Sequence, residues 1–290
     1  MERGDWSSLE GIPPDIDLLV DRIDQPKVGF FGPESATWHV ARERVVRLCG
    51  VSTILLQLAH PKVAKGVADH SEFEADPVAR FERTFDLVDA VLFGDRDTAL
   101  EAALAIRGTH ERVSGTLEES VGPFDGGEAY DATDPALLQW VHATLIEQSI
   151  AGYEHYVGSL AADTWERYYQ EAITVGRLLG VPAERYPETL DGFHEYYEQM
   201  IRSELAVGSV GRRQRETLER EGPGPAALYE FFAGPTLPPS MREAYGVPWS
   251  DRREWLFQRM AGGSRRFTPR LPARLRFIPA YRDAMVRVGQ

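Results

Sequence analysis

Seven histidines are the side chains of this 290-residue chain best able to hold a metal, because Cys49 is its only cysteine. They are His39, His60, His70, His110, His142, His155 and His194. His110 is the strongest candidate ligand. It follows Ala103 and Ile106 at helical spacing, which places the three residues on one apolar face and turns the imidazole toward the core. A zinc site built on cysteines is excluded.

Arginines and a hydroxyl are expected near this imidazole. Arg107 lies one helical turn before His110, and Arg80 and Thr84 share a face of the preceding helix, with Arg83 beside Thr84. A buried guanidinium requires an anionic or structural partner, such as a haem propionate or a buried carboxylate. One imidazole with several arginines is typical of haem, which takes one axial protein ligand and carries two carboxylates.

A second histidine lies in a long apolar helix. His142, with Thr144 two residues later, is the alternative iron ligand; the competing interpretation is a hydrogen-bonded core histidine. His60 precedes Pro61 and is expected to act as a cation at a helix end. The motifs of common catalytic sites are absent: phosphate loop, dinucleotide fingerprint, nucleophile elbow and zinc-protease helix. The single Asp-x-x-His, ending at His194, is not enough for a di-iron bundle.

The composition excludes several function classes. The chain is 43% hydrophobic, which is enough for a sizeable core, and it carries 32 basic against 45 acidic residues, a net charge of −13. Such a charge repels nucleic acid. The basic residues of 212–215 and 252–287 are interpreted as partners in ion pairs with nearby acids. With neither a signal peptide nor a membrane-spanning stretch, we expect a cytoplasmic protein. Cys49 is expected to be a buried structural thiol.

Helix signals recur along the chain and strand signals are weak, so the predicted fold is all-α. The expected helices span 33–60 (one or two helices), 62–70, 77–93, 98–114, 135–158, 164–179 and 190–207. Asp76, Asp134 and Asp163 are the expected N-caps, and Gly94, Gly115, Gly180 and Gly208 the expected stops. We divide the chain into an N-terminal arm (1–31), a helical core (32–221) and a Pro/Gly-rich, basic C-terminal segment (222–290) that wraps the core.

The same segments carry a family resemblance. It spans residues 32–205 in ordered blocks: 55–61 (LLQLAHP), 63–71, the helix with Arg80 and Thr84, the helix with Arg107 and His110, and 140–145 (WVHATL). In these blocks the chain resembles the haem-dependent oxygenases that include mpaB and the latex-clearing rubber oxygenases.

The resemblance implies a single globin-like helical domain of about eight or more helices, an irregular C-terminal tail and b-type haem iron. It implies that O2 is used to cleave double bonds of an apolar, isoprenoid-like small molecule. His110 matches the family's proximal ligand, while Arg80, Thr84 and Arg107 match positions near the haem. Thr144 matches another such position.

Two departures concern the distal side of the haem. Arg83 stands where rubber oxygenases carry a lysine, and residues 61–66 have Lys62 and Lys65 but no glutamate. Rubber cleavage itself is therefore not expected. Two alternatives remain: a haem carrier or sensor without catalysis, and a haem-free helical protein that binds an apolar ligand. The sequence does not define the oligomeric state.

Overall fold

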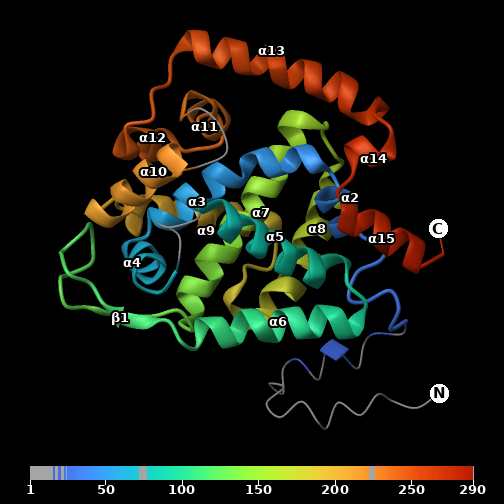
Figure 1. Ribbon diagram of the computed structural model, residues 1–290, viewed down its shortest axis with the longest axis horizontal. Helices are drawn as coiled ribbons and strands as arrows, with labels where there is room; N and C mark the ends of the chain where they lie inside the picture. Colours follow the sequence, from blue (N-terminus) through green and yellow to red (C-terminus); the bar gives the residue numbers. More distant parts are fainter. Residues whose placement is uncertain are drawn as a thin grey trace.

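The computed structural model describes residues 16, 19–20, 23, 25–71, 77–221 and 226–289, and helices dominate it (Figure 1). The α-helices are α2 (Ala36–Ala41), α3 (Gly50–Leu58), α4 (Pro61–His70), α5 (Pro77–Phe93), α6 (Arg96–His110), α7 (Pro135–Tyr156), α8 (Ala162–Leu178), α9 (Leu190–Ser203), α10 (Ser209–Glu221), α11 (Ala226–Ala233), α12 (Pro239–Tyr245), α13 (Asp251–Phe267), α14 (Ala273–Arg276) and α15 (Pro279–Arg287). The 3-10 helices are η2 (Arg44–Cys49), η4 (Ala183–Arg185) and η5 (Thr268–Arg270). The predicted all-α class is confirmed.

Helix α7 occupies the middle of the molecule (Figure 1). It starts as expected: Pro135 is its first residue, and the Asp134 carboxylate accepts a hydrogen bond from the Ala136 amide. It has buried residues on all sides, from Trp140 to Tyr156, and packs against η2, α3, α8 and α13. A helix that is apolar all round must be enclosed by others. The position of α7 therefore follows from its sequence.

Helices α5 and α6 form an antiparallel pair on one side of α7. A second apolar cluster, which includes Trp38, Phe93 and Leu100, lies at the end of this pair. The Trp38 indole donates to the Leu92 carbonyl at 2.7 Å, which satisfies the polar atom of a fully buried ring. The N-cap of α6 is Asp95, whose carboxylate accepts a hydrogen bond from the Thr98 amide.

The chain after α6 differs from the prediction of a helix over 98–114. Helix α6 ends at His110, and Ser114–Thr116 (β1) pairs antiparallel with Ala129–Asp131 (β2). Gly115 is not a helix stop: it lies in β1, where a Cβ atom would come within 2.5 Å of the Tyr130 hydroxyl. The glycine allows the tyrosine ring to cross the hairpin.

Other expected boundaries have mixed outcomes. Helices α4, α5, α7 and α8 lie within two residues of their predicted limits. The N-cap of α8 is Ala161, so Asp163 is in the first turn instead. Gly208 precedes α10 and ends no helix, whereas Gly94 and Gly180 follow helix ends as predicted. Asp76 lies outside the described residues.

The C-terminal segment is more helical than its prolines and glycines predict. Helix α13, which has 17 residues, runs along the edge of the molecule beside α11 and α12, and α15 reaches α5 (Figure 1). Arg276 of α14 holds the fully buried carboxylate of Glu43 with two hydrogen bonds of 2.6 and 2.8 Å. Within the described residues, no helix is long and apolar enough to cross a bilayer.

Candidate functional site

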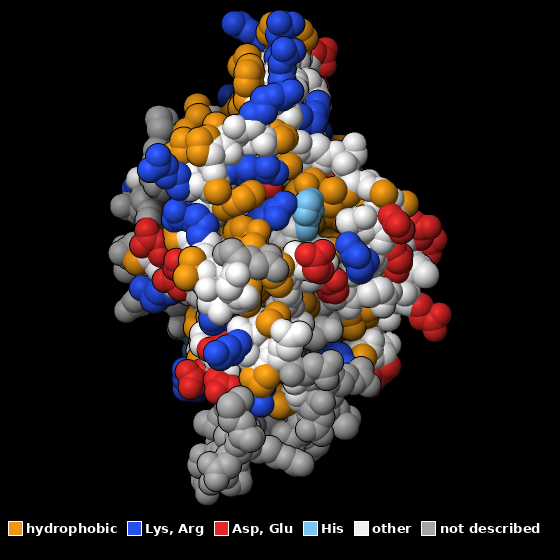
Figure 2. All heavy atoms as spheres, turned by 90° about the vertical axis from the view of Figure 1, so that its right-hand side faces the viewer, with side chains coloured by type: hydrophobic (Ala, Val, Ile, Leu, Met, Phe, Trp, Pro, Cys, Tyr) orange, Lys and Arg blue, Asp and Glu red, His pale blue; other side chains and the backbone are white. Residues whose placement is uncertain are grey.

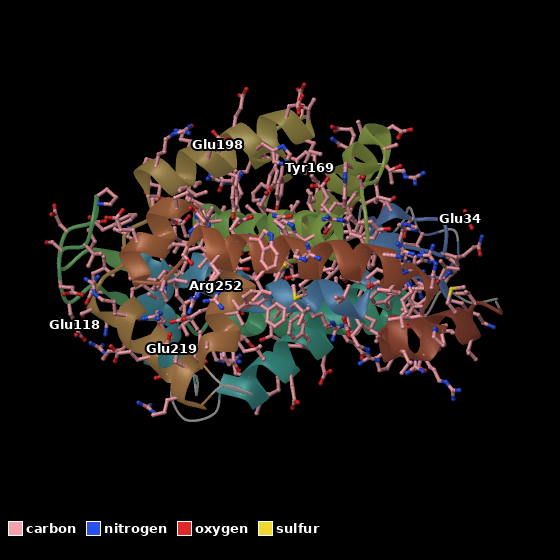
Figure 3. The ribbon with its side chains drawn as sticks, turned by 90° about the horizontal axis from the view of Figure 1, so that it is seen from above. Glu34, Glu118, Tyr169, Glu198, Glu219 and Arg252 are labelled. Carbon is pink, nitrogen blue, oxygen red and sulfur yellow. The ribbon has the colours of Figure 1, made fainter. Side chains whose placement is uncertain are left out.

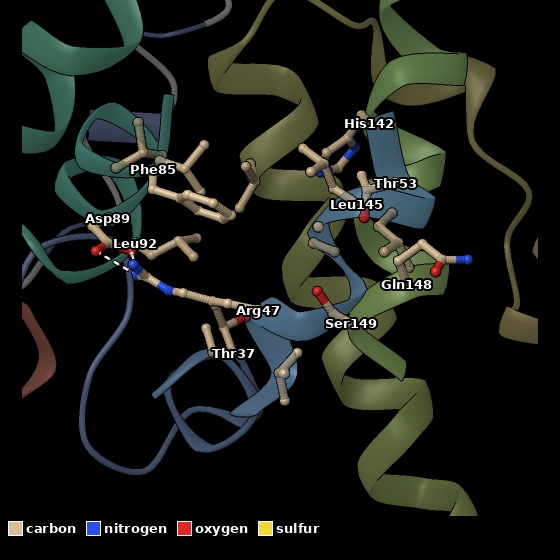
Figure 4. Close-up of a pocket in the computed structure, with 18 of the residues that line it drawn as sticks. Thr37, Arg47, Thr53, Phe85, Asp89, Leu92, His142, Leu145, Gln148 and Ser149 are labelled. Carbon is tan, nitrogen blue, oxygen red and sulfur yellow. Dashed lines mark hydrogen bonds and ion pairs between the residues drawn. The ribbon is translucent and has the colours of Figure 1, made fainter. Parts of the chain in front are cut away.

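An apolar cavity of about 140 Å³ lies between α5 and α7. Phe85 and Val88 of α5 line one side, and Leu145 and Ile146 of α7 line another (Figure 4). Helix α6 contributes Ile106, and parts of η2, α3 and α8 complete the wall. A concave, mainly apolar space with few accessible polar groups is typical of a site for an apolar ligand.

His142 is the imidazole that lines this cavity. It is 4% exposed, and its Nδ1 atom lies 2.7 Å from the Tyr186 hydroxyl. Burial lowers the pKa of His142 to about 4, so the ring is neutral at physiological pH. Among the described residues, no other group hydrogen-bonds to either side of this pair. This hydrogen bond has two possible forms: the Tyr186 hydroxyl donates to Nδ1 and the ring proton of His142 is on Nε2, or Nδ1–H donates to the hydroxyl oxygen.

His110 is the last residue of α6, one turn beyond the cavity residue Ile106. Its Nδ1 atom is buried and has no hydrogen-bond partner among the described residues. Burial lowers the pKa of His110, which favours the neutral form that a metal requires. A buried polar atom without a partner is costly and therefore marks a candidate ligand site.

Arg107 contacts the end of a neighbouring helix. It donates to the carbonyls of Leu178 (2.9 Å) and Arg177 (2.6 Å) at the C-terminus of α8. Carbonyls at a helix C-terminus carry the negative end of its dipole, so they suit a guanidinium. The anionic or structural partner that this guanidinium was expected to need thus includes backbone, and Arg107 fastens α6 to α8.

Of the residues of α5 that were expected to face inward, only Arg80 is largely buried. Arg80 is largely buried and donates to the Ser71 hydroxyl at 2.8 Å, and burial together with Arg83 lowers its pKa. Thr84, by contrast, is exposed and donates to the Arg80 carbonyl. The prediction that Thr84 points inward is wrong, because its hydroxyl satisfies its own helix, and Arg83 is also exposed.

Thr144 is fully buried but lies on a different face of α7 from His142. Its hydroxyl donates to the Val141 carbonyl (2.7 Å) and accepts from the Gln57 amide at 3.0 Å. This bond fastens α3 to α7. Of the seven sequence-predicted site residues, only His142 lines the cavity.

Polar groups that the sequence analysis missed lie at the other end of the cavity. Arg47 and Asp89 form a two-pronged ion pair with both oxygens at 2.6 Å from one nitrogen (Figure 4). The carboxylate of Glu43 also lines the cavity and is held by Arg276. No local motif marks these pairs, since their partners are 42 and 233 residues apart. Tyr186, 44 residues from His142, was missed for the same reason.

The predictions for Cys49 and His60 had different outcomes. Cys49 is a buried free thiol in the cavity wall, as expected, and burial raises its pKa to about 12. His60 is not a cation at a helix C-terminus. It is the N-cap of α4, its ring packs against Phe124, and burial and Lys62 lower its pKa to about 4. Within the described part of the chain, no three His, Cys, Asp or Glu side chains come close enough to share a metal.

The chain belongs to the family described as ER-bound oxygenase mpaB/B'/Rubber oxygenase, catalytic domain, which it matches over residues 37–266. The family is one of oxygenases, which implies O2 and a substrate. The match includes most of α13, and so reaches about sixty residues beyond the end of the resemblance at 205.

Two mycobacterial proteins are similar to the chain. They are the uncharacterized protein Mb2261 of Mycobacterium bovis and the uncharacterized protein Rv2237 of Mycobacterium tuberculosis. Each is 26% identical over 225 residues, which cover 72% of this chain and 85% of the relative. No solved structure matches the chain significantly.

Proposed function

We propose that this chain is a b-type haem-dependent oxygenase that acts with O2 on an apolar, unsaturated, isoprenoid-like small molecule. His110 is the protein ligand of the iron in this proposal. The observation that carries it is the buried Nδ1 atom of His110, which lacks a partner one turn from the apolar cavity. The family membership supports oxygen chemistry.

The donor chemistry of the site fits haem. A haem iron needs one axial ligand, and His110 is a neutral, largely buried imidazole. In this proposal the Tyr186 hydroxyl donates to Nδ1 of His142, which leaves the ring proton on Nε2, the nitrogen that would have to bind iron. The proposal therefore assigns iron binding to His110 and hydrogen bonding to His142.

The volume of the cavity is the second test of fit. At about 140 Å³ it is smaller than the roughly 300–1,000 Å³ of typical cofactor pockets. Haem would therefore require the cavity to widen, and we propose that α5 moves to allow this. Helix α5 packs against α6, α10 and α15, and its Asp89 pairs with Arg47, so these contacts would have to rearrange.

When bound, haem supplies the iron at which O2 is activated. The chain supplies the surroundings. Phe85, Val88 and Leu145 exclude water and hold an apolar chain by contact alone. The Nε2–H of His142 offers one hydrogen-bond donor to an oxygen atom in the cavity, and Tyr186 fixes its direction.

A visible spectrum of the purified protein, before and after reconstitution with haem, tests the proposal. We expect a Soret band that His110→Ala abolishes or shifts. His194→Ala is the matched control, because His194 is 41% exposed on α9 and pairs with Glu147 away from the cavity. The His142→Phe variant should keep the Soret band, because the substitution removes a hydrogen-bond donor and not the proposed iron ligand.

Three outcomes would contradict the assignment. A reconstituted protein without a Soret band excludes haem, and a band unchanged in His110→Ala excludes that ligand. A band lost only in His142→Phe moves the ligand to α7. Oxygen consumption with a reductant and an isoprenoid such as farnesol then separates an oxygenase from a haem carrier or sensor, which would show the band without turnover.

The second candidate function is the binding of a small apolar ligand without haem. The cavity volume favours it, because a cavity of about 150 Å³ holds a benzene-sized molecule. Thermal unfolding of the haem-free protein with and without cyclohexanone tests this candidate. An increase in Tm that the cavity-filling substitution Val88→Trp abolishes would support it, and no increase would contradict it.

A further inference from the structure

One outward side of α13 and α14 combines arginines with large apolar side chains. We call it the arginine–apolar face; it comprises Arg252, Trp255, Leu256, Arg259, Arg266, Phe267, Arg270, Leu271, Arg274 and Leu275. In α13 these positions recur at spacings of three, four and seven residues, so they form one stripe. The opposite stripe, with Phe257 and Ala261, is fully buried against the body of the molecule.

The apolar side chains of this face are unusually accessible. It holds five of the eight large hydrophobic residues that are exposed in the described part of the chain. They are Trp255 (58%), Leu256 (51%), Phe267 (63%), Leu271 (43%) and Leu275 (60%). Exposed apolar side chains that gather on one face mark an interaction surface, whereas scattered ones do not.

The charge of this region is opposite to that of the rest of the chain. Residues 251–276 contain eight arginines and two acidic residues, a net charge of +6, while the other residues carry 24 basic and 43 acidic side chains, a net charge of −19. Figure 2 shows basic and hydrophobic side chains together at the top of the molecule. Seen from above, Arg252 lies over the body, while Glu34, Glu118 and Glu198 lie toward the rim (Figure 3).

The arginines of the face are not neutralised by nearby carboxylates. Arg253 and Arg276, which flank the face, form ion pairs with Glu230 and Glu43. Among the described residues, the arginines of the face itself form none; Arg259 instead lies over the ring of Trp255, 5.0 Å from its centroid. For this face, the sequence-based interpretation of the basic segment as ion-paired is therefore wrong. The guanidinium groups of the face are therefore available to an anionic partner from outside.

We propose that the arginine–apolar face docks this protein on an anionic lipid surface, with α13 lying in the plane of the headgroups. Its arginines contact lipid phosphates, while Trp255 and Phe267 enter the boundary between headgroups and acyl chains. The acidic remainder of the chain is repelled by the same surface, which fixes one orientation. This inference does not depend on haem.

Charge and composition favour lipid over two other partners. In a symmetric dimer, this face would meet itself and bring two sets of arginines together. Nucleic acid would match the charge, but it would leave three leucines exposed to water. An anionic bilayer alone offers both phosphates and an apolar layer within the length of one side chain.

Vesicle flotation of the full chain tests the proposal, with vesicles of phosphatidylcholine alone and vesicles that also contain phosphatidylglycerol. We expect binding to the second kind only, reduced at high salt because the attraction is screened. The triple substitution Arg259→Gln/Arg266→Gln/Arg274→Gln should weaken binding about a hundredfold, at about fivefold per arginine. Trp255→Ser/Phe267→Ser should weaken it while the charge is retained.

Matched controls change charge and apolarity elsewhere on the surface. Arg112→Gln/Arg202→Gln/Arg213→Gln removes three other exposed arginines, and Val286→Ser removes another exposed apolar side chain. Both controls should float like the wild type. All the altered residues are exposed, so far-ultraviolet circular dichroism should be unchanged in every variant. Vesicles should also shift the tryptophan emission to shorter wavelength in the wild type, and less in Trp255→Phe.

The proposal is overturned if the wild type does not float with phosphatidylglycerol vesicles, or if the arginine triple floats as the wild type does. It is also overturned if the control triple loses binding equally, since the effect would then reflect net charge alone. Light scattering tests a second copy of the chain as the partner: a dimer that Trp255→Ser/Phe267→Ser dissociates, without vesicle binding, would assign the face to a second copy.

Discussion

The Tyr186 hydroxyl lies 2.7 Å from Nδ1 of His142, and the direction of this hydrogen bond determines which nitrogen of the imidazole carries the ring proton. Gly176 makes the contact possible, because a Cβ atom there would clash with the hydroxyl oxygen. Since we propose that the hydroxyl donates, we expect nitrogen-15 NMR to find His142 in the Nε2–H form. In Tyr186→Phe the preference should disappear, and the lost partner should reduce the free energy of unfolding by about 1–3 kcal/mol.

The control for this substitution is Tyr229→Phe. The Tyr229 hydroxyl is buried without a partner among the described residues, so its removal should cost little and leave His142 unchanged. An Nδ1–H form in the wild type would reverse the direction of the hydrogen bond and remove the proposed donor from the cavity.

Gly176 itself should tolerate no side chain. In Gly176→Ala, the added methyl group would also approach within 3.0 Å of His142 Nδ1, and the fully enclosed rings cannot both move away. We expect a loss of about 1–3 kcal/mol in urea denaturation. Gly263→Ala, in α13, is the matched helical control: nothing lies within 4 Å of its Cβ, so it should gain up to about 1 kcal/mol. Equal effects of the two substitutions would show that helix propensity, not packing, determines the result.

The pH dependence of stability should report the low pKa of His60. In the unfolded chain the imidazole has a pKa near 6.5, and in the folded chain near 4, so between these values the unfolded state binds more protons. Stability is therefore complete above pH 6.5 and declines as the pH falls toward 4, by at most about 1.4 kcal/mol per pH unit. His60→Asn should reduce this slope while retaining an N-cap for α4.

His194 gives the contrast for that experiment. The Glu147 carboxylate raises the pKa of His194, so its contribution is present below pH 6.5 and is lost as the pH rises through the folded pKa. His194→Asn should therefore lower the free energy of unfolding below pH 6.5, and its effect should fade as the pH rises through the folded pKa of His194. An unchanged acid slope in His60→Asn would show that His60 is protonated in the folded protein.

The ion pair between Arg276 and Glu43 should contribute more to stability than any surface pair. Glu43 is fully buried, and both of its oxygens accept from Arg276. Arg276→Leu would leave the carboxylate without this partner, at a cost of about 3–5 kcal/mol in chemical denaturation. Arg274→Leu, in the same short helix but exposed, should cost little. If Arg276→Leu and Arg274→Leu lowered the free energy of unfolding equally, the C-terminal segment would stabilise the protein only by covering the core.

Much of the fold was predictable because helix signals are local. The Asp134–Pro135 start of α7 and the glycines after α5 and α8 depend only on neighbouring residues. The β1–β2 hairpin was missed because its pairing is between segments, and the helical pattern through Val113 continued into it. The length of α13 was missed because two glycines interrupt an otherwise helical stretch.

The candidate site was less predictable, because contacts between distant residues determine it. The long apolar helix indicated that His142 is buried, but it gave no sign of the Tyr186 hydroxyl that contacts it. The arginine of the Arg-x-x-His pair was expected to face a cofactor, yet it satisfies the carbonyls of α8. A helical pattern shows which side of a helix is buried; it does not show whether a guanidinium there binds a ligand or the end of another helix.

The environment of Cys49 has a consequence for the durability of an oxygen-using protein. Only the thiolate form of cysteine is readily oxidised, and with a pKa near 12 almost none of this thiol is in that form at neutral pH. Its sulfur is further covered by Gly152, where even a methyl group would come within 3.0 Å. The single cysteine of the chain can therefore lie in the wall of the cavity without becoming a target of the reactive oxygen that the proposed function would bring there.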